Sequence, residues 1–199
     1  MGRPKEITDE EIVIAARRCF IERGAGVSAA DIARELGVSH TTLFNRFGSK
    51  EGLMLAALGP PTEISWIAAL EAGPDRRPVR TQLLAHAKTM SAYFQELQAG
   101  FGILLAAGID PGRAHRARKG GSAPEQGYQA LVGWLGRAQA QGRLGKCDPD
   151  TLASTILGAL HGWAFTARVC GTACSATAHS GYIERFIDLL WNGIGNKKE

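Results

Sequence analysis

Cysteine is scarce in this chain, and its placement argues against a disulfide framework. The four cysteines are irregularly spaced: Cys19, Cys147, Cys170 and Cys174. Because we expect an intracellular chain, we expect its thiols to be reduced and mostly buried. Cys170 and Cys174, followed by His179, leave open a metal site of the form C-x3-C-x4-H, although zinc sites usually have closer cysteine pairs and a readable fourth ligand. Packing near a helix end is the alternative, and we expect no metal.

Long apolar runs are also missing. No segment approaches the roughly 18 unbroken apolar residues that a membrane span needs, and the opening Met-Gly-Arg-Pro-Lys-Glu lacks the apolar core of a signal peptide. Hydrophobic residues make up 45% and charged residues 21% of the 199, which is typical of a folded globular protein. We therefore expect a cytoplasmic location.

The N-terminal part lacks a surplus of positive charge, although the whole chain carries a net charge of +4. Residues 1–58 contain eight basic and eight acidic side chains. Between Ser39 and Lys50, however, there are two basic residues and no acidic one. The charge pattern that favours nucleic acid is therefore local to this segment.

Catalytic motifs are absent as well. The sequence contains no G-x-S-x-G and no HExxH, and Gly145-Lys146 is followed by Cys147 without the other elements of a phosphate-binding loop. Gly100-x-Gly102 lacks the third glycine and the preceding strand of a dinucleotide fingerprint. An enzyme is the main rival interpretation because a helical body with histidines and cysteines can house catalysis, but we expect no enzyme and no cofactor.

No run alternates with period two, whereas apolar residues recur at steps of three and four along nearly every segment. We predict an all-α fold, with a three-helix head over residues 1–58 and a helical body over residues 62–199. Gly59-Pro60-Pro61 should break the chain between them. The body helices are expected over residues 62–72, 79–97, 101–107, 124–141, 148–169 and 180–193, with a basic loop over 108–123.

The segment Ser28–Phe47 has the pattern of a helix-turn-helix. Ala33 is small enough for a second helix to approach closely, and Gly37 supplies the positive φ of a tight turn. The seam between the two helices is predicted to bury Ile32, Leu36, Val38, Leu43 and Phe47. The helix after the turn then projects from the body, and such a helix fits the major groove of DNA.

Side chains on the second helix of this motif are predicted to contact DNA. His40 and Thr41 lie in its first turn and are expected to read bases, and Asn45 points away from the buried Leu43. The groups expected to contact phosphates at helix starts are Ser28, Ser39, Thr42 and Lys50. Arg3 is a candidate for a short arm in the minor groove, with disorder as the alternative.

Residues 8–58 resemble the N-terminal head of TetR-family (tetracycline-repressor-like) regulators. The resemblance rests on three stretches: AAxxCFIERG, VSAADIARELGVS and TTLFNRFGSKEGL. It implies that Lys50 and Thr42 contact phosphates and that His40 and Thr41 address bases. Phe44 stands where the family usually has tyrosine, so its contact is apolar, for example to a thymine methyl. The family's fourth helix usually continues unbroken, whereas Gly59-Pro60-Pro61 should interrupt it here.

The resemblance further implies an effector pocket in the body and a dimer formed by the last two helices. The candidates for effector contact are His86, Met90, Phe94, Trp134, His161 and Phe165. The candidates for the dimer interface are Leu152, Ile156, Leu160, Trp163, Ile183, Phe186, Ile187, Leu190 and Trp191. The loop bearing Arg113, Arg116, Arg118 and Lys119 either is solvated or supplements the binding of DNA or an anionic ligand.

Together these features predict a sequence-specific transcriptional regulator. We expect a homodimeric repressor that binds a palindromic operator and is released by a largely apolar small molecule, with no membrane partner. A helix-turn-helix that contacts only protein is a second rival. The dependence of duplex binding on salt separates the two, because neutralised phosphates give a steep negative slope.

Overall fold

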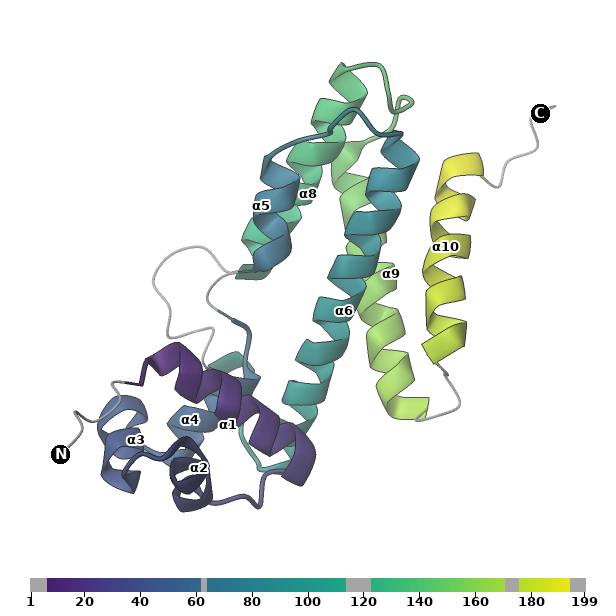
Figure 1. Cartoon of the computed structure of the whole chain (residues 1–199). Coiled ribbons are helices and arrows are strands. Elements are labelled where there is room, and N and C mark those ends of the chain that lie inside the picture. Colours follow the sequence, from purple (N-terminus) through teal and green to yellow (C-terminus); the bar gives the residue numbers. More distant parts are fainter. Residues whose placement is uncertain (1–6, 62–63, 114–122, 171–175, 194–199) are drawn as a thin grey trace. The chain divides into compact units, whose positions relative to one another are not determined.

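The computed structural model describes residues 7–61, 64–113, 123–170 and 176–193, without the side chains of 123, 170 and 176–180. The regular secondary structure of these residues is helical throughout, with no strand among them, which confirms the predicted all-α fold (Figure 1). The chain forms two compact units, which we call the head and the body. The head comprises residues 1–62 and 97–120, and the body comprises residues 63–96 and 121–199.

The first four helices belong to the head: α1 (Asp9–Arg23), α2 (Ala29–Leu36), α3 (His40–Phe47) and α4 (Lys50–Leu58). The capping box predicted at the start of α1 is confirmed. Thr8 Oγ1 accepts from the Glu11 amide at 3.1 Å, and the Thr8 amide donates to Glu11 Oε2 at 2.8 Å. The box satisfies two backbone donors that would otherwise lack partners, one in the first turn of α1 and one at its N-cap.

The head has its own hydrophobic core. Helix α1 packs on α2 and α4, and α3 packs on α2 and α4. The largest side chains that are fully buried in this core are Phe20, Ile12, Ile32, Leu43, Leu53, Leu58 and Leu104. The three short helices after α1 are therefore held by shared burial, because helices of this length are marginal alone.

The predicted break after the fourth helix is confirmed. Helix α4 ends at Leu58, Gly59 follows in an extended conformation, and Pro60 and Pro61 lie outside the helix. The next helix, α5 (Ser65–Glu71), is shorter than the predicted segment from residue 62 to 72.

Helix α6 corrects the prediction of two separate helices over 79–97 and 101–107. It runs without interruption from Val79 to Ala106. Gly100 does not end it, because this position faces the end of α4: a Cβ added there would lie 2.4 Å from the Leu58 carbonyl oxygen. Here glycine permits close packing of two backbones.

Two units share α6. Its residues up to Glu96 belong to the body, and those from Leu97 belong to the head, where Leu104 is fully buried. Phe101 and Ile109 pack against the same head core. The boundary predicted between residues 58 and 62 therefore leaves out one segment of the head. Residues 97–120 also belong to the head, although they are far from its first part in the sequence.

The body contains α5, the first part of α6, α8 (Ala123–Ala140), α9 (Pro149–Cys170) and α10 (Ala176–Asn192). Helix α8 packs on both α5 and α9. Ion pairs join α6 to α10, with Lys88 Nζ 2.8 Å from Glu184 Oε1 and a second pair between Arg80 and Asp188. The body core is aliphatic and aromatic, with Met90, Leu131 and Trp134 fully buried.

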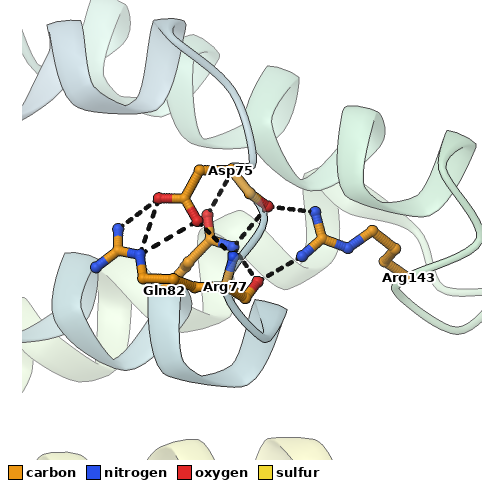
Figure 2. A network of polar contacts seen from close by, with 4 residues as sticks. All are labelled: Asp75, Arg77, Gln82 and Arg143. Atoms are coloured by element: carbon orange, nitrogen blue, oxygen red, sulfur yellow. Dashed lines mark hydrogen bonds and ion pairs between the residues drawn. The ribbon is translucent and has the colours of Figure 1, made fainter.

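A polar network holds the connection between α5 and α6 (Figure 2). Buried Gln82 accepts from the Asp75 amide at 2.9 Å and donates to the Arg77 carbonyl at 2.5 Å. Arg143, which follows α8, donates to the carbonyls of Asp75 and Arg77. The hydrogen bond from the Arg77 side chain lowers the pKa of Asp75, so that carboxylate stays ionised near neutral pH.

Candidate nucleic-acid interface

The helix-turn-helix forms as predicted. Ser28 caps α2 by accepting from the Asp31 amide, and Ser39 caps α3 by accepting from the Thr42 amide, both at 3.1 Å. Gly37 between the helices has φ 68° and ψ 26°, the left-handed conformation that favours glycine. The Val38 amide donates back to the Ala33 carbonyl at 3.0 Å and closes the turn.

The outer face of α3 is open to solvent. His40, Thr41 and Asn45 are exposed, whereas Leu43 is 1% exposed and anchors the helix to the head core. Helix α3 thus presents the side chains expected to read bases and buries its opposite face. Figure 1 shows α3 at the surface of the head, beside α2 and α4. The geometry of the head leaves the predicted base-reading residues available to a duplex.

Two short contacts order the first turn of α3. The rings of His40 and Phe44, one helical turn apart, have centroids 4.5 Å apart and are tilted by 54°. Ser39 Oγ and Thr42 Oγ1 lie 2.8 Å apart. Phe44, which is 41% exposed, restricts the rotamers of His40 in addition to offering its own apolar surface.

Lys50 at the start of α4 is half-buried and already has a partner. Its Nζ donates to the Ala25 carbonyl at 2.6 Å, so the ammonium group ties α4 to the connection between α1 and α2. An ammonium group has three donors, which leaves capacity for a phosphate oxygen. The structure therefore gives Lys50 a packing role beside the predicted phosphate contact.

Arg46, on the last turn of α3, makes contacts that were not predicted from the sequence. Its Nη1 donates to the Ile7 carbonyl and lies 3.0 Å from Asp9 Oδ1, which joins α3 to the start of α1. No local pattern signals this contact, because the partners are 37 and 39 residues apart in the chain.

A second network joins α1 to α2. Glu35 accepts from Arg18 and, at 2.9 Å, from Arg23, and the buried thiol of Cys19 donates to it at 3.2 Å. The hydrogen bond from Arg18 is the main cause of the lowered pKa of Glu35, while burial raises the pKa of the Cys19 thiol. Cys19 is therefore a protonated packing residue at neutral pH.

Several predicted residues lie outside the described part of the chain: Arg3, Arg116, Arg118, Lys119 and Cys174, together with the side chains of Cys170 and His179. Of the basic loop, Arg113 is described, and it pairs with Glu51 in the first turn of α4. The described residues hold no cluster of three potential metal ligands.

The comparisons with known proteins agree with this geometry. Residues 12–57 match the model of the bacterial regulatory proteins of the tetR family. This similarity to the tetR family covers residues of α1 to α4 in the head. Over 109 residues it is 28% identical to the HTH-type transcriptional repressor BdcR of Escherichia coli strain K12, an alignment that covers 54% of this chain and 55% of BdcR. The match thus spans about half the length of this curated relative.

Solved structures show the same fold over nearly the whole length. A TetR/AcrR-family regulator from Thermobifida fusca has a TM-score of 0.63 at 22% identity, covering 94% of this chain and 98% of that one. PfmR from Thermus thermophilus has a TM-score of 0.57 at 21% identity, covering 93% and 99%. No helix in the described residues is long and apolar enough to cross a membrane.

The six candidates for effector contact differ in exposure. Met90 and Trp134 are fully buried, His86 and Phe94 are half-buried, and His161 and Phe165 are exposed. Ring contacts link two pairs of them: His86 with Trp134 at 5.1 Å, and Phe94 with His161 at 5.4 Å. Candidates on α6 therefore contact one candidate ring of α8 and one of α9.

The candidate dimer residues divide into two groups. Ile156, Leu160, Ile183 and Ile187 are buried in the core of their own chain, which corrects their assignment to a surface. Periodicity identifies an apolar stripe but does not say whether it faces the same chain or a partner. Trp191 is 41% exposed, and Leu152, Trp163, Phe186 and Leu190 are half-buried.

Other exposed apolar groups lie on the same two helices, outside the predicted dimer residues. The large apolar side chains with at least half of their surface exposed there are Phe165, Val169 and Leu189. Trp163 of α9 stacks on Tyr182 of α10 with centroids 4.1 Å apart. Helices α9 and α10 therefore each carry exposed apolar side chains in addition to those that pack within the chain.

Proposed function

We propose that this chain is a sequence-specific DNA-binding transcriptional repressor. The observation that carries the proposal is the exposed first turn of α3, where His40 and Thr41 stand on a helix held by its buried Leu43. A helix so presented fits the major groove, where side chains of the first turn reach base edges. The description of BdcR as a repressor supports repression as the direction of regulation.

The proposed phosphate contacts surround this turn. Ser28 and Ser39 lie at helix starts with exposed side chains, and Thr42 and Lys50 are half-buried beside them. Amides and hydroxyls at helix N-termini suit anionic oxygens. These contacts would set the register of α3 on the duplex, whereas His40, Thr41 and Asn45 would select the sequence.

We further propose a cytoplasmic homodimer that binds a palindromic operator and is released by a small molecule bound in the body. The exposed apolar groups of α9 and α10 support self-association, because such patches on a soluble protein mark interaction surfaces. An effector that binds better to one shape of the dimer would lower operator affinity through coupling of about 1–3 kcal/mol. We expect no catalytic activity.

The test is binding to the DNA that flanks the chain's own gene, located by footprinting and measured at several salt concentrations. Lys50→Ala should weaken binding to operator and unrelated duplex alike and reduce the salt slope by about 1 per protomer. His40→Ala should cost about 1–3 kcal/mol on the operator and relax base preference there. Lys146→Ala, an exposed lysine of the body, is the matched control and should change neither quantity.

The salt slope separates the two roles of Lys50. Loss of its hydrogen bond to Ala25 would destabilise the head without altering the number of phosphates neutralised. A reduced slope with an unchanged melting temperature therefore identifies a phosphate contact. A flat slope for the unmodified protein would instead indicate a protein-contact module, and operator affinity unaffected by either substitution would refute the residue assignments.

A further inference from the structure

Two buried indole groups in the body have no hydrogen-bond partner among the described residues. Trp66 on α5 is 4% exposed and Trp134 on α8 is fully buried, and the Nε1 atom of each is without an acceptor. Both belong to one hydrophobic core, and α5 packs directly on α8. Buried indole N–H groups usually find a partner, so each exception calls for a physical explanation.

A phenylalanine at either position would provide apolar surface without an unsatisfied donor. The indole nitrogen therefore costs free energy unless another molecule supplies the acceptor. Trp66 is closely held in its place, since a Cβ at Gly127 would lie 2.5 Å from its Cη2 atom. The α8 backbone thus packs on this ring and restricts its turning toward another acceptor.

The surroundings of the two indoles are aromatic. Ring contacts lead from Trp66 to Tyr93 at 5.9 Å, from Tyr93 to Phe94 at 5.5 Å, and from Phe94 to His161 at 5.4 Å. The series runs from a buried ring to an exposed one. Ring edges and faces of this kind favour flat, aromatic molecules.

The same surroundings lack charge. Among the described residues of the body, the buried polar side chains are Gln82 and Ser91, and neither is ionisable. His86, whose ring meets the edge of Trp134, has its pKa lowered by burial and is neutral at pH 7. A charged ligand would find no buried counter-ion there and would lose its hydration.

We propose that the body binds an uncharged, flat aromatic effector whose carbonyl-type oxygen accepts a hydrogen bond from the indole N–H of Trp66 or Trp134. This inference rests on the proposed function, because it names the class of effector for the regulator. The indole N–H groups select for an acceptor, the aromatic series selects for shape, and the absence of a buried charge excludes ions. The effector of this chain is thereby distinguished from sugars, metal ions and acyl carboxylates.

The test compares ligands that share one frame. Fluorene and 9-fluorenone are the same flat three-ring molecule except for the carbonyl oxygen of fluorenone, and 9-fluorenone-4-carboxylate adds a charge. Equilibrium dialysis against the full-length protein should show fluorenone binding about tenfold more tightly than fluorene, since satisfying one buried donor is worth about that factor. Simple apolar burial predicts the reverse order, because fluorene is the more hydrophobic. The carboxylate should bind at least about tenfold more weakly than fluorenone.

Substitutions then assign the donor. The preference for fluorenone should fall to about one or below in Trp66→Phe/Trp134→Phe, and the single variants show which indole supplies it. Leu131→Ala is the matched control: it loosens the same core without removing a donor, so it should change both affinities and keep their ratio. A preference that survives in the double variant overturns the proposal. So does equal or tighter binding of fluorene by the unmodified protein, a result that needs no variant to fold.

Operator binding by the same preparations distinguishes this inference from the proposed function. Salt-dependent DNA binding without a preference for fluorenone overturns the proposed effector class and supports the proposed DNA-binding regulator. A preference for fluorenone together with no salt-dependent DNA binding supports the site in the body and overturns the proposed regulator.

Discussion

Gly100→Ala is expected to lower the free energy of unfolding of the head by about 2 kcal/mol. The added Cβ would lie 2.4 Å from the Leu58 carbonyl oxygen and 3.2 Å from its carbon, which are backbone atoms that no change of rotamer can move. Overpacking of this kind costs about 1–3 kcal/mol, and occasionally more, while alanine returns up to about 1 kcal/mol of helix propensity. Urea denaturation followed by circular dichroism measures the difference.

The matched control is Gly136→Ala on α8, where nothing lies within 4 Å of the added Cβ. Helix propensity alone predicts a gain of about 0.5–1 kcal/mol there. The two substitutions are chemically identical, so opposite changes in the free energy of unfolding would indicate the close approach of α6 to α4. Equal stabilisation by both would mean that α6 does not pack against the end of α4 as described.

The second large effect concerns self-association. Leu189→Glu on α10 is expected to convert a dimer to a monomer at micromolar concentration, as measured by sedimentation velocity. Leu189 is 50% exposed on the same helix as Phe186 and Trp191. Loss of a central apolar contact costs about 2 kcal/mol or more, and a two-fold interface contains each residue twice. The sum of about 4 kcal/mol corresponds to a factor of about 1,000 in Kd.

Leu105→Glu is the control for this experiment. Leu105 is 64% exposed and belongs to the part of α6 in the head, so the same change of side chain there should leave association unchanged. A dimeric Leu189→Glu protein would place the interface elsewhere. Sedimentation of the unmodified chain as a monomer at micromolar concentration would count against a dimer altogether.

Local signals made the head predictable. Thr8, Ser28 and Ser39 are caps whose side chains act within three residues, and Gly37 is a turn residue whose role depends on its own φ. Short-range chemistry of this kind is readable because both partners are close in the sequence. The helix-turn-helix and the solvent-exposed face of α3 follow from it.

The contacts of Lys50 and Arg46 were not predictable in the same way. Lys50 binds a carbonyl 25 residues earlier, and Arg46 reaches 39 residues back to Ile7. A basic residue on a helix that faces DNA is consistent with a phosphate contact, a structural contact or both. Only the packing of α3 and α4 against the rest of the head distinguishes these roles.

The body shows the same limit for apolar residues. A stripe with helical spacing on α9 and α10 indicates burial, yet Ile156 and Ile187 are buried within the chain while Leu189 is exposed. Hydrophobic periodicity predicts that a helix face is shielded from water. It does not predict whether the same chain or a partner covers that face. The two indole N–H groups without acceptors were likewise not predictable from the sequence. Whether a donor has a hydrogen-bond partner depends on which residues lie near it in the folded chain.

By itself, the amino-acid order determined the helical class, the turn at Gly37, the break after Leu58 and the outward side chains of α3, because each depends on residues within a few positions of one another. Tertiary structure alone decided that residues 97–120 join the head, that α6 passes Gly100 without ending, and which apolar stripes remain exposed. These three features depend on contacts between residues that are far apart in the sequence. The local spacing of residues does not predict burial against such a distant partner.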